Sequence, residues 1–336
     1  MKKLLITSGA RLSNKGLHLG HYLGCFTPLN NITEDYEFYF VINDVSNLKL
    51  KTEDKEDSLV NMVGDILSIE TPKNIRIFLQ SDILKHQSDF YNNLQKITTF
   101  NQLIATHPHK KEIKTGTSQL TVLDYLFPLR DAVVYLSLET DFVLMNDDNA
   151  RIIDFTRRIA QKINNLVNSS NGELLLKTPF LKTGFIPRLL GSDYKKMCNG
   201  NNNAIYLTES PKNLKIKVEK LFNTKYLNTF LKEKCGSMPE NNIDPNDVFI
   251  PNKIAQLLGE TDFSFKFDRN EKGDYLLKYD DTDVITSFFN LIEKSMYKFR
   301  IKKETFSNKR DIIIAKLRDD YAYLETLMNN FKSKLI

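Results

Sequence analysis

The sequence predicts an α/β fold built on a parallel sheet and followed by a mostly helical C-terminal region. Short apolar runs, rich in β-branched and aromatic residues, alternate with amphipathic segments of helical period. Such alternation is typical of parallel strands joined by right-handed helical crossovers. Polar residues cluster where the apolar runs end, and ligands of such sheets bind beyond the carboxyl ends of the strands. A binding crevice is therefore expected at that edge.

The predicted elements follow in chain order from these apolar and amphipathic patterns. Strands are expected over residues 2–9, 36–48, 74–83 and 141–149, each with a polar end. Helices are expected over 16–32, 55–70 and 90–103, from near Pro128, and over 149–170. A polar loop is expected over 107–119.

The pattern changes after Leu207. Helices are expected from Ser210 and from Val284 onward, and a small hairpin over 263–281. The 336 residues are therefore divided into an α/β domain over 1–210 and a mainly helical domain over 211–336, with the boundary near 207–215.

Composition limits the classes of protein to consider. With 41% hydrophobic residues the chain can bury a sizeable core, and its net charge of +5 permits a polyanionic partner without requiring one. The three cysteines lack paired or metal-binding spacing, which favours free thiols in a reducing compartment. No apolar run has membrane-spanning length, and the N-terminal run is too short for a signal peptide. We therefore predict a cytoplasmic protein that does not bind a membrane.

The stretch "GLHLGHYLG", residues 16–24, carries the first candidate chemistry. His18 and His21 lie three residues apart, so a helix places them on one face. Gly20 between them lets a flat group approach the backbone. Imidazoles in this position can hydrogen-bond a phosphate oxygen and stabilise charge that develops on an α-phosphate. The alternative is two ordinary helix histidines.

A metal site is not predicted. No third and fourth ligand accompanies the histidine pair, and the motif "HPH" at 107–109 has no supporting carboxylate pattern.

Several collinear segments give these histidines a context. "SGARLSNKGLHLGHYLG" is followed by "FVINDVSNL", "IRIFLQSDI", "DYLFPLRDAVVYLSLETDFVLMNDDNARIIDFTRRIAQKIN" and "PRLLGSDYKKMCNGNNNAIYLTESPKNLKIKV". Together they resemble class I aminoacyl-tRNA synthetases with their HIGH and KMSKS signatures, and within these most closely the tryptophanyl-tRNA synthetase family. The resemblance covers about residues 1–220, and the C-terminal third is only loosely similar.

The resemblance implies a Rossmann-like catalytic domain that activates an amino acid with ATP, accompanied by Mg²⁺, and transfers it to tRNA. It also implies a homodimer whose helical C-terminal domain holds the anticodon. The catalytic groups implied are His18, His21, Lys195 and Lys196. The ATP contacts implied are Gly9, Arg11, Gly20, His21, Asn146, Asp147, Asp148, Leu189, Lys196, Met197, Cys198, Asn199 and Gly200. The amino-acid pocket implied is Thr7, Asp44, Asp131, Val134, Val143 and Asp147.

The KMSKS signature of the family becomes "KMCNG" in this chain, over residues 196–200. Asn199 replaces the lysine closest to the phosphates, and Cys198 and Gly200 replace the serines. An amide cannot neutralise a phosphate as an ammonium does, and losing such a contact costs several kcal/mol at the transition state. Adenylate formation is expected to be slow, or to rely on another cation such as Lys195.

The amino-acid pocket also departs from the family. Val134 stands where the family carries the aspartate that accepts the indole N–H of tryptophan, and Asp131 stands where it carries an uncharged side chain. Asn146 replaces a glycine beside the retained Asp147–Asp148 pair. A buried carboxylate at Asp131 needs a partner. These changes argue against tryptophan and fit a ligand with an amine or guanidinium, or no amino acid.

Two further features leave alternatives open. Asp44, at the end of the second strand, either meets a substrate amine or caps a loop. The basic run over 297–310, with interleaved aromatic residues, either follows an RNA backbone or is a solvated helix face.

Two hypotheses of function result. The first is an adenylate-forming, tRNA-charging ligase with altered amino-acid specificity. The second is a weakened synthetase paralogue that binds tRNA, a nucleotide or a protein without charging tRNA. A small-molecule nucleotidylyltransferase, which shares the HxGH motif, fits less well because of the second domain and the "NAIYL" segment.

Overall fold

The computed structural model of the chain describes most of its 336 residues. The described residues are 2–6, 10–27, 29, 32, 35–45, 52–69, 75–107, 110, 113, 115, 120–144, 150–167, 176, 180–182, 189–198, 202–235, 245, 249–260, 265, 267–272, 274–277, 281–307 and 310–335.

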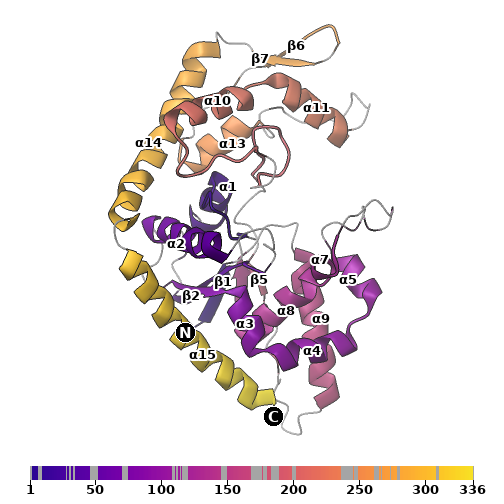
Figure 1. Ribbon diagram of the computed structural model, residues 1–336. Coiled ribbons are helices and arrows are strands. Elements are labelled where there is room, and N and C mark those ends of the chain that lie inside the picture. The colour runs from indigo at the N-terminus through magenta and orange to yellow at the C-terminus, as the bar shows by residue number, and fades with distance from the viewer. Residues whose placement is uncertain are drawn as a thin grey trace.

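A five-stranded parallel sheet forms the centre of the N-terminal part, as predicted (Figure 1). Its strand order is β3-β2-β1-β4-β5. The strands are β1 (Lys2–Ile6), β2 (Tyr36–Ile42), β3 (Arg76–Leu79), β4 (Phe142–Leu144) and β5 (Phe180–Lys182). Leu4 pairs in register with Phe38 of β2 and with Phe142 of β4, so β1 lies at the centre of the sheet.

The observed strands are shorter than the predicted ones, and β5 was not predicted. The third predicted strand, for example, ends at Leu79 because Gln80 begins a helix that includes Ser81 to His86. Strand β5 has only three residues, too few to show a strand period, and it is defined by its pairing with β4.

Helices cover the sheet and form the C-terminal part. The N-terminal helices are α1 (Leu19–His21), the π-helical turn η1 (Tyr22–Phe26), α2 (Thr52–Ser68), α3 (Gln80–His86), α4 (Ser88–Ile97), α5 (Phe100–Thr106), α7 (Val122–Tyr125), α8 (Phe127–Ser137) and α9 (Ala150–Val167). The C-terminal helices are α10 (Pro211–Leu221), α11 (Thr224–Cys235), α13 (Ile250–Leu257), α14 (Asp281–Ser307) and α15 (Arg310–Leu335).

The segment over 90–103 is two helices rather than the one predicted. Helix α4 ends at Ile97, and Thr98 and Thr99 have extended backbone. Thr99 then caps α5: its hydroxyl accepts from the Gln102 N–H, and its own N–H donates to the Gln102 side chain. This reciprocal capping box starts a new helix and changes the direction of the chain.

Apolar side chains fill both faces of the sheet. Leu4 and Leu5, adjacent in β1, are both fully buried but belong to different core clusters. Successive strand residues point to opposite faces, so the sheet is covered on both sides, as parallel sheets are. The cluster around Leu4 extends to Phe288 and Ile292 of α14, which makes the core continuous across the predicted domain boundary. That boundary stays a prediction.

The C-terminal part contains the predicted hairpin, formed by β6 (Phe267–Arg269) and antiparallel β7 (Tyr275–Leu277). Helix α14 runs from this part down to α2, and α15 continues along the edge of the sheet beside β3 (Figure 1). The last helix thus packs against the N-terminal part of the chain.

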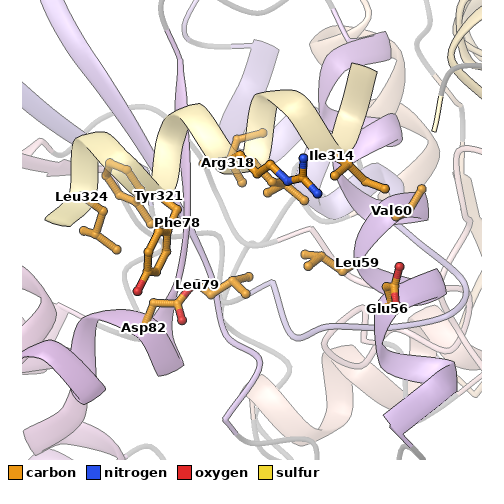
Figure 2. A pocket seen from close by; sticks show the side chains of 12 residues that line it. Glu56, Leu59, Val60, Phe78, Leu79, Asp82, Ile314, Arg318, Tyr321 and Leu324 are labelled. Atoms are coloured by element: carbon orange, nitrogen blue, oxygen red, sulfur yellow. The ribbon is translucent and has the colours of Figure 1, made fainter. Parts of the chain in front are cut away.

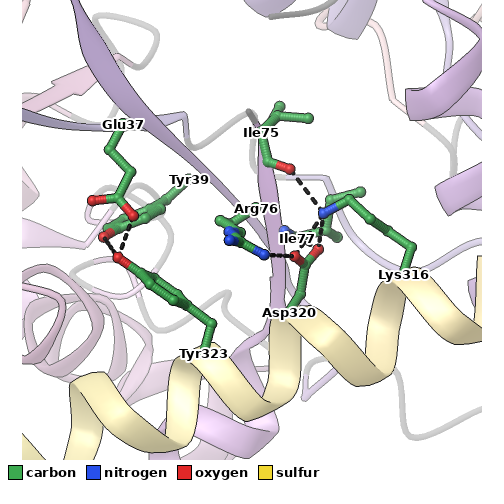
Figure 3. A network of polar contacts seen from close by, with 8 residues as sticks. All are labelled: Glu37, Tyr39, Ile75, Arg76, Ile77, Lys316, Asp320 and Tyr323. Atoms are coloured by element: carbon green, nitrogen blue, oxygen red, sulfur yellow. Dashed lines mark hydrogen bonds and ion pairs between the residues drawn. The ribbon is translucent and has the colours of Figure 1, made fainter. Parts of the chain in front are cut away.

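A network of polar contacts ties α15 to the sheet (Figure 3). The carboxylate of Asp320 is fully buried and accepts from the Ile77 N–H at 2.9 Å and from Arg76 at 3.1 Å. Lys316 also pairs with Asp320, and it donates to the Ile75 carbonyl at 2.9 Å. Strand β3 is the edge of the sheet, so these contacts and α15 cover an edge that would otherwise be exposed.

A groove of about 480 Å³ lies between α2, β3 and α15 (Figure 2). Its walls are mainly apolar, with Leu59 and Val60 on α2, Leu79 on β3 and Tyr321 on α15. None of the predicted site residues lines it. No helix among the described residues is long and apolar enough to cross a bilayer.

Candidate functional site

His18 and His21 lie against each other just beyond the end of β1. His18 has extended backbone, with φ −116° and ψ 168°, and Leu19 begins the short helix α1. The two imidazole rings stack with centroids 3.7 Å apart and planes 19° apart. The His18 N–H donates to Nδ1 of His21 at 3.3 Å. The predicted juxtaposition of the two rings is present in the structure.

Both histidines are buried, with 5% and 6% of their surface exposed. Burial lowers the pKa of His21 to about 3 and the pKa of His18 well below its usual value, and the nearby Lys196 charge lowers both further. Both rings are therefore neutral at physiological pH. Nδ1 of His18 has no hydrogen-bond partner among the described residues, which leaves it available to a ligand.

Gly20 is required by its own neighbours. A Cβ on Gly20 would lie 2.9 Å from the His18 ring and 3.4 Å from Sδ of Met197. Any larger residue would push the His18 ring away from its position. The sequence suggested that Gly20 leaves room for a ligand. The structure shows that it leaves room for the His18 ring and for Met197, which belongs to the "KMCNG" stretch.

The signature loop, which we define as residues 189–198, closes on itself beside the histidines. Leu190 and Lys196 form an antiparallel bridge, and the Gly191 N–H donates to the Lys195 carbonyl at 2.8 Å. The side chains of Lys195 and Lys196 are exposed, while Leu189 and Met197 are buried. The lysine ammonium groups therefore lie on the solvent side of the loop, and Lys196 is near enough to influence both histidines.

Asn203 holds the signature loop in this shape, and it was not among the site residues predicted from the sequence. Its amide donates to Asp193 at 2.7 Å and to the Lys196 carbonyl at 2.9 Å, and its carbonyl accepts from the Cys198 N–H at 3.1 Å. Asn203 is 2% exposed. The signal that could have found it is its place in "NNNAIYL", directly after the signature loop.

The segment 205–207 pairs with the backbone on either side of His18. The Leu19 N–H donates to the Ile205 carbonyl at 2.8 Å, and the Leu207 N–H donates to the Leu17 carbonyl at 2.9 Å. The Tyr206 ring lies edge-on to His18, with centroids 6.3 Å apart. The two stretches that carry the HIGH-like and KMSKS-like signatures are therefore joined through the backbone.

Asp131 lies in a second polar cluster, at the start of α8. Its carboxylate accepts from the Gln80 amide at 2.9 Å and from the Tyr135 hydroxyl at 3.5 Å, so the partner that a buried carboxylate requires is present. Burial raises the pKa of Asp131 to about 7, although Arg130, Gln80 and Tyr135 oppose the shift. Gln80 was not among the predicted residues, but it follows directly after β3, where polar residues were expected.

Arg130, next to Asp131, is 2% exposed. Its Nε and Nη1 find no hydrogen-bond partner among the described residues, and neither does Oε1 of Gln80. Unpaired buried donors and acceptors are costly, each about 1–3 kcal/mol. The cluster therefore has donors and an acceptor that a polar ligand can satisfy.

Val134 and Val143 are buried at 2% and 0% and belong to one apolar cluster under the sheet. Asp44 accepts from the Ser81 N–H at 3.0 Å, which is the loop-capping role considered above.

Arg11 is exposed, and its backbone forms a bridge with Asn43. His107 is buried, and Nε2 of its ring contacts the Asp124 carbonyl at 2.9 Å.

Seven predicted site residues lie outside the described residues. They are Thr7, Gly9, Asn146, Asp147, Asp148, Asn199 and Gly200.

The fold and the site define a class of protein. A parallel sheet carries a neutral histidine pair beyond its central strand, and a lysine-bearing loop closes beside that pair. Such an arrangement suits an α/β protein that binds a phosphorylated ligand at the carboxyl edge of its sheet.

Comparison with known proteins places the chain within this class. The model of the family described as tRNA synthetases class I (W and Y) matches residues 1–253. The chain belongs to this family of ATP-dependent aminoacyl-tRNA ligases, as its resemblance to the tryptophanyl-tRNA synthetases predicted.

Among named relatives, the tryptophan–tRNA ligase of Fusobacterium nucleatum is 26% identical over 271 residues, which is 78% of this chain and 80% of the relative. That of Borreliella burgdorferi is 24% identical over 91% of this chain and 86% of the relative.

Among solved structures, the tryptophanyl-tRNA synthetase of Campylobacter jejuni complexed with ADP and tryptophan has a TM-score of 0.69 at 18% identity. The match extends over 100% of this chain and 98% of the Campylobacter chain. The enzyme of Mycoplasma pneumoniae has a TM-score of 0.72 at 18% identity, with 99% and 96% of the two chains covered. These structures confirm the predicted Rossmann-like fold.

Proposed function

We propose that the chain activates an amino acid with ATP and transfers the activated acyl group to tRNA. The observation that carries this proposal is the buried, neutral His18–His21 pair beside the Lys196 loop. Membership in the class I synthetase family supports it.

In the first step, a carboxylate oxygen of the amino acid attacks the α-phosphorus of ATP. The bond from that phosphorus to the bridging oxygen breaks, and pyrophosphate leaves with the electron pair. Neutral His18 and His21 suit the role of hydrogen-bond donors to phosphate oxygens, which gain charge in the transition state. Lys195 and Lys196, exposed on the signature loop, would neutralise the departing pyrophosphate.

In the second step, a hydroxyl of the terminal adenosine of tRNA attacks the acyl carbon of the adenylate. The bond from the acyl carbon to the phosphate oxygen breaks, AMP leaves with the electron pair, and the proton of the attacking hydroxyl is released. Mg²⁺ is expected to neutralise charge on the phosphates of ATP. No group of three or more acidic, histidine or cysteine side chains converges within the described ranges. We propose that Mg²⁺ arrives bound to the phosphates of ATP.

We propose that the amino acid is not tryptophan. Val134 lies in an apolar cluster and provides no acceptor for an indole N–H. Asp131, Gln80 and Tyr135 form a hydrogen-bonded group instead, beside the buried guanidinium of Arg130. A substrate side chain with both donors and acceptors would satisfy the unpaired atoms of Arg130 and Gln80.

We propose tRNA and a second copy of the chain as partners. One face of α14 exposes Lys294, Tyr297, Lys298, Ile301 and Lys302, a combination suited to an RNA backbone. Phe100 and Val122 are 59% and 75% exposed, and the Phe100 ring contacts Tyr125 of α7, the helix that begins at Val122. Large exposed apolar side chains of this kind fit a homodimer interface. The cytoplasm is the proposed compartment, because ATP and tRNA are available there.

Exchange of labelled pyrophosphate into ATP, screened with each of the twenty amino acids, tests the proposal. We expect exchange with a polar amino acid and little exchange with tryptophan. Strong exchange with tryptophan alone would show that the specificity argument is wrong.

The second candidate function is binding without charging, and the loss of the signature lysine at Asn199 favours it. ATP binding by calorimetry, with no exchange for any amino acid at high enzyme concentration, would support this alternative. The Asn199→Lys variant tests whether the missing lysine limits the reaction. We expect faster exchange if a missing cation limits the reaction, and an unchanged rate if Lys195 already supplies it.

A further inference from the structure

Asp65 is a fully buried carboxylate on α2 that lies outside the predicted site. Its Oδ2 accepts from the Leu17 N–H at 2.7 Å. Its Oδ1 forms an ion pair at 2.5 Å with Lys303, whose side chain is 14% exposed. Lys303 belongs to α14 in the C-terminal part of the chain. A contact from that part therefore reaches the residue directly before His18.

The backbone before His18 fits closely onto this carboxylate. Gly16 has a positive φ of 70°, and a Cβ there would lie 2.0 Å from Oδ2 of Asp65. Asn61, one turn before Asp65, donates to the Asn14 carbonyl at 3.0 Å and accepts from Lys303 at 2.5 Å. The turn over 14–17 is thus held on α2 at two places, and Lys303 contacts the side chain responsible for each.

A second residue of α14 supports the other side of His18. Arg300 donates to the Glu209 carbonyl at 3.1 Å. Lys217 of α10 pairs with the Glu209 carboxylate and donates to the Ala204 carbonyl at 2.6 Å. The residues between, 205–207, are those whose backbone pairs with Leu17 and Leu19. Helix α14 is therefore linked to both backbone segments that surround His18, through Asp65 and Asn61 on one side and through Glu209 on the other.

The electrostatics explain why Lys303 matters to Asp65. Burial raises the pKa of Asp65, whereas the charge and hydrogen bond of Lys303 and the Leu17 N–H lower it. Removing the lysine would leave a buried carboxylate without that compensating charge, and such a group either takes up a proton or moves toward water. Either change weakens its hold on the Leu17 N–H. The His18 ring, stacked on His21, would then lose one of its backbone supports.

We propose that Lys303 and Asp65 are positioning residues for the His18–His21 pair, and that they couple the C-terminal helix α14 to the histidine site. The readout by activity rests on the proposed function, while the readout by hydrogen exchange does not.

The test uses the full chain and compares Lys303→Met with Lys303→Arg and with Lys316→Met. Lys316 is a matched control because it pairs with another buried aspartate, Asp320, which holds the backbone N–H of Ile77 on the edge strand β3 rather than one next to His18. Hydrogen–deuterium exchange is followed in peptides covering residues 12–22 and 76–79. Pyrophosphate exchange is normalised to the ATP-binding stoichiometry, so that unfolded protein does not contribute.

We expect Lys303→Met to speed hydrogen exchange around Leu17 about tenfold and to lower kcat about tenfold, with little change in the KM for ATP. Lys303→Arg should restore both, and Lys316→Met should change neither at the histidine site. Unchanged protection around Leu17 in Lys303→Met would overturn the proposal. If the wild type shows no pyrophosphate exchange, the proposed function fails, but the hydrogen exchange result still decides this inference.

If Lys303→Met does not fold, the double variant Asp65→Leu/Lys303→Met replaces the ion pair with apolar side chains. It should fold and still show faster exchange at Leu17, because the acceptor of that N–H is gone. Slow exchange at Leu17 in the folded double variant would contradict the proposal.

Discussion

Asp65 and Asp320 are two buried aspartates with nearly the same surroundings in different regions of the molecule. Each is 0% exposed, and each accepts from one backbone N–H, of Leu17 and Ile77 respectively. Each also pairs with a lysine from a C-terminal helix. Asp320, however, is paired with Arg76 as well, and it holds the edge strand rather than the histidine segment.

The difference shows that one kind of contact can serve two purposes. At Asp320 a larger network, which includes the hydroxyl contact between Tyr39 and Tyr323 at 3.3 Å, fastens α15 over the sheet edge (Figure 3). Its main effect should be on stability. At Asp65 the same chemistry holds a turn that ends at His18. Its main effect should be on the geometry of the site.

The largest expected effect is on stability at the sheet edge. Asp320→Ala removes the acceptor of the Ile77 N–H and the partner of Arg76 and Lys316. We expect the free energy of unfolding to fall by about 3–5 kcal/mol, as when a buried ion pair is broken. Urea denaturation measures it, and hydrogen exchange around Leu17 should stay unchanged. A loss below about 1 kcal/mol would remove the distinction between the two aspartates.

The next largest effect is expected for Asn203, a buried amide that holds the signature loop as Asp65 holds the turn before His18. Asn203→Ala removes the contacts to Asp193, Lys196 and Cys198 that shape the signature loop. We expect a loss of about 1–3 kcal/mol in stability, and a larger proportional loss of pyrophosphate exchange. The matched control is Asn228→Ala, since Asn228 makes the same kind of paired contact with the Tyr275 backbone, on β7. Equal loss of exchange in both variants would argue against a specific role for Asn203.

The third effect concerns Asp131, a carboxylate whose partners are an amide and a hydroxyl, whereas Asp65 and Asp320 each pair with a lysine. Burial raises the pKa of Asp131 to about 7 from an unfolded value near 3.8. The folded protein therefore binds the proton more tightly, and stability falls as pH rises from about 4 to 7 and then levels off. Asp131→Asn should lack this dependence.

The expected difference in pH dependence is on the order of 2 kcal/mol, which is below the full value of the shift because the residue as a whole is partly exposed, so that water screens the enclosed carboxylate to some extent. Urea denaturation of both proteins at pH 5 and pH 8 measures it. If the free energy of unfolding changed by the same amount in the wild type and in Asp131→Asn, other titrating groups would dominate the pH dependence.

The smallest effect is expected for Arg310, whose ion pairs with two carboxylates are exposed to solvent. Arg310 of α15 pairs with Glu56 at 2.6 Å and with Asp57 at 2.8 Å, and all three side chains face solvent. Exposed ion pairs contribute little because water screens them. Arg310→Ala should leave the urea midpoint unchanged within error. A clear decrease would show that burial is not what makes the Asp65 and Asp320 contacts stronger than this exposed pairing.

Much of the fold and part of the site could be predicted from the sequence. Four strands, the helical crossovers and the hairpin follow from periodicity, which is a local property. The adjacency of His18 and His21 was predicted from their spacing of three on a helix, whereas in the structure His18 has extended backbone and caps the helix that contains His21. The split between α4 and α5 was missed, because the capping box of Thr99 and Gln102 competes with a helical pattern that continues through it.

The sequence by itself determined that this is an α/β protein with a histidine pair and an altered lysine loop, because these are contiguous patterns of few residues. Only the tertiary structure decided that Asn203 shapes that loop, that residues 205–207 pair around His18, and that Lys303 reaches the same place through Asp65. Those contacts join residues distant in the chain. A polar side chain needs a hydrogen-bond partner when folding buries it. Which side chains become buried, and next to which partner, depends on the packing of the whole molecule and not on the adjacent residues in the sequence.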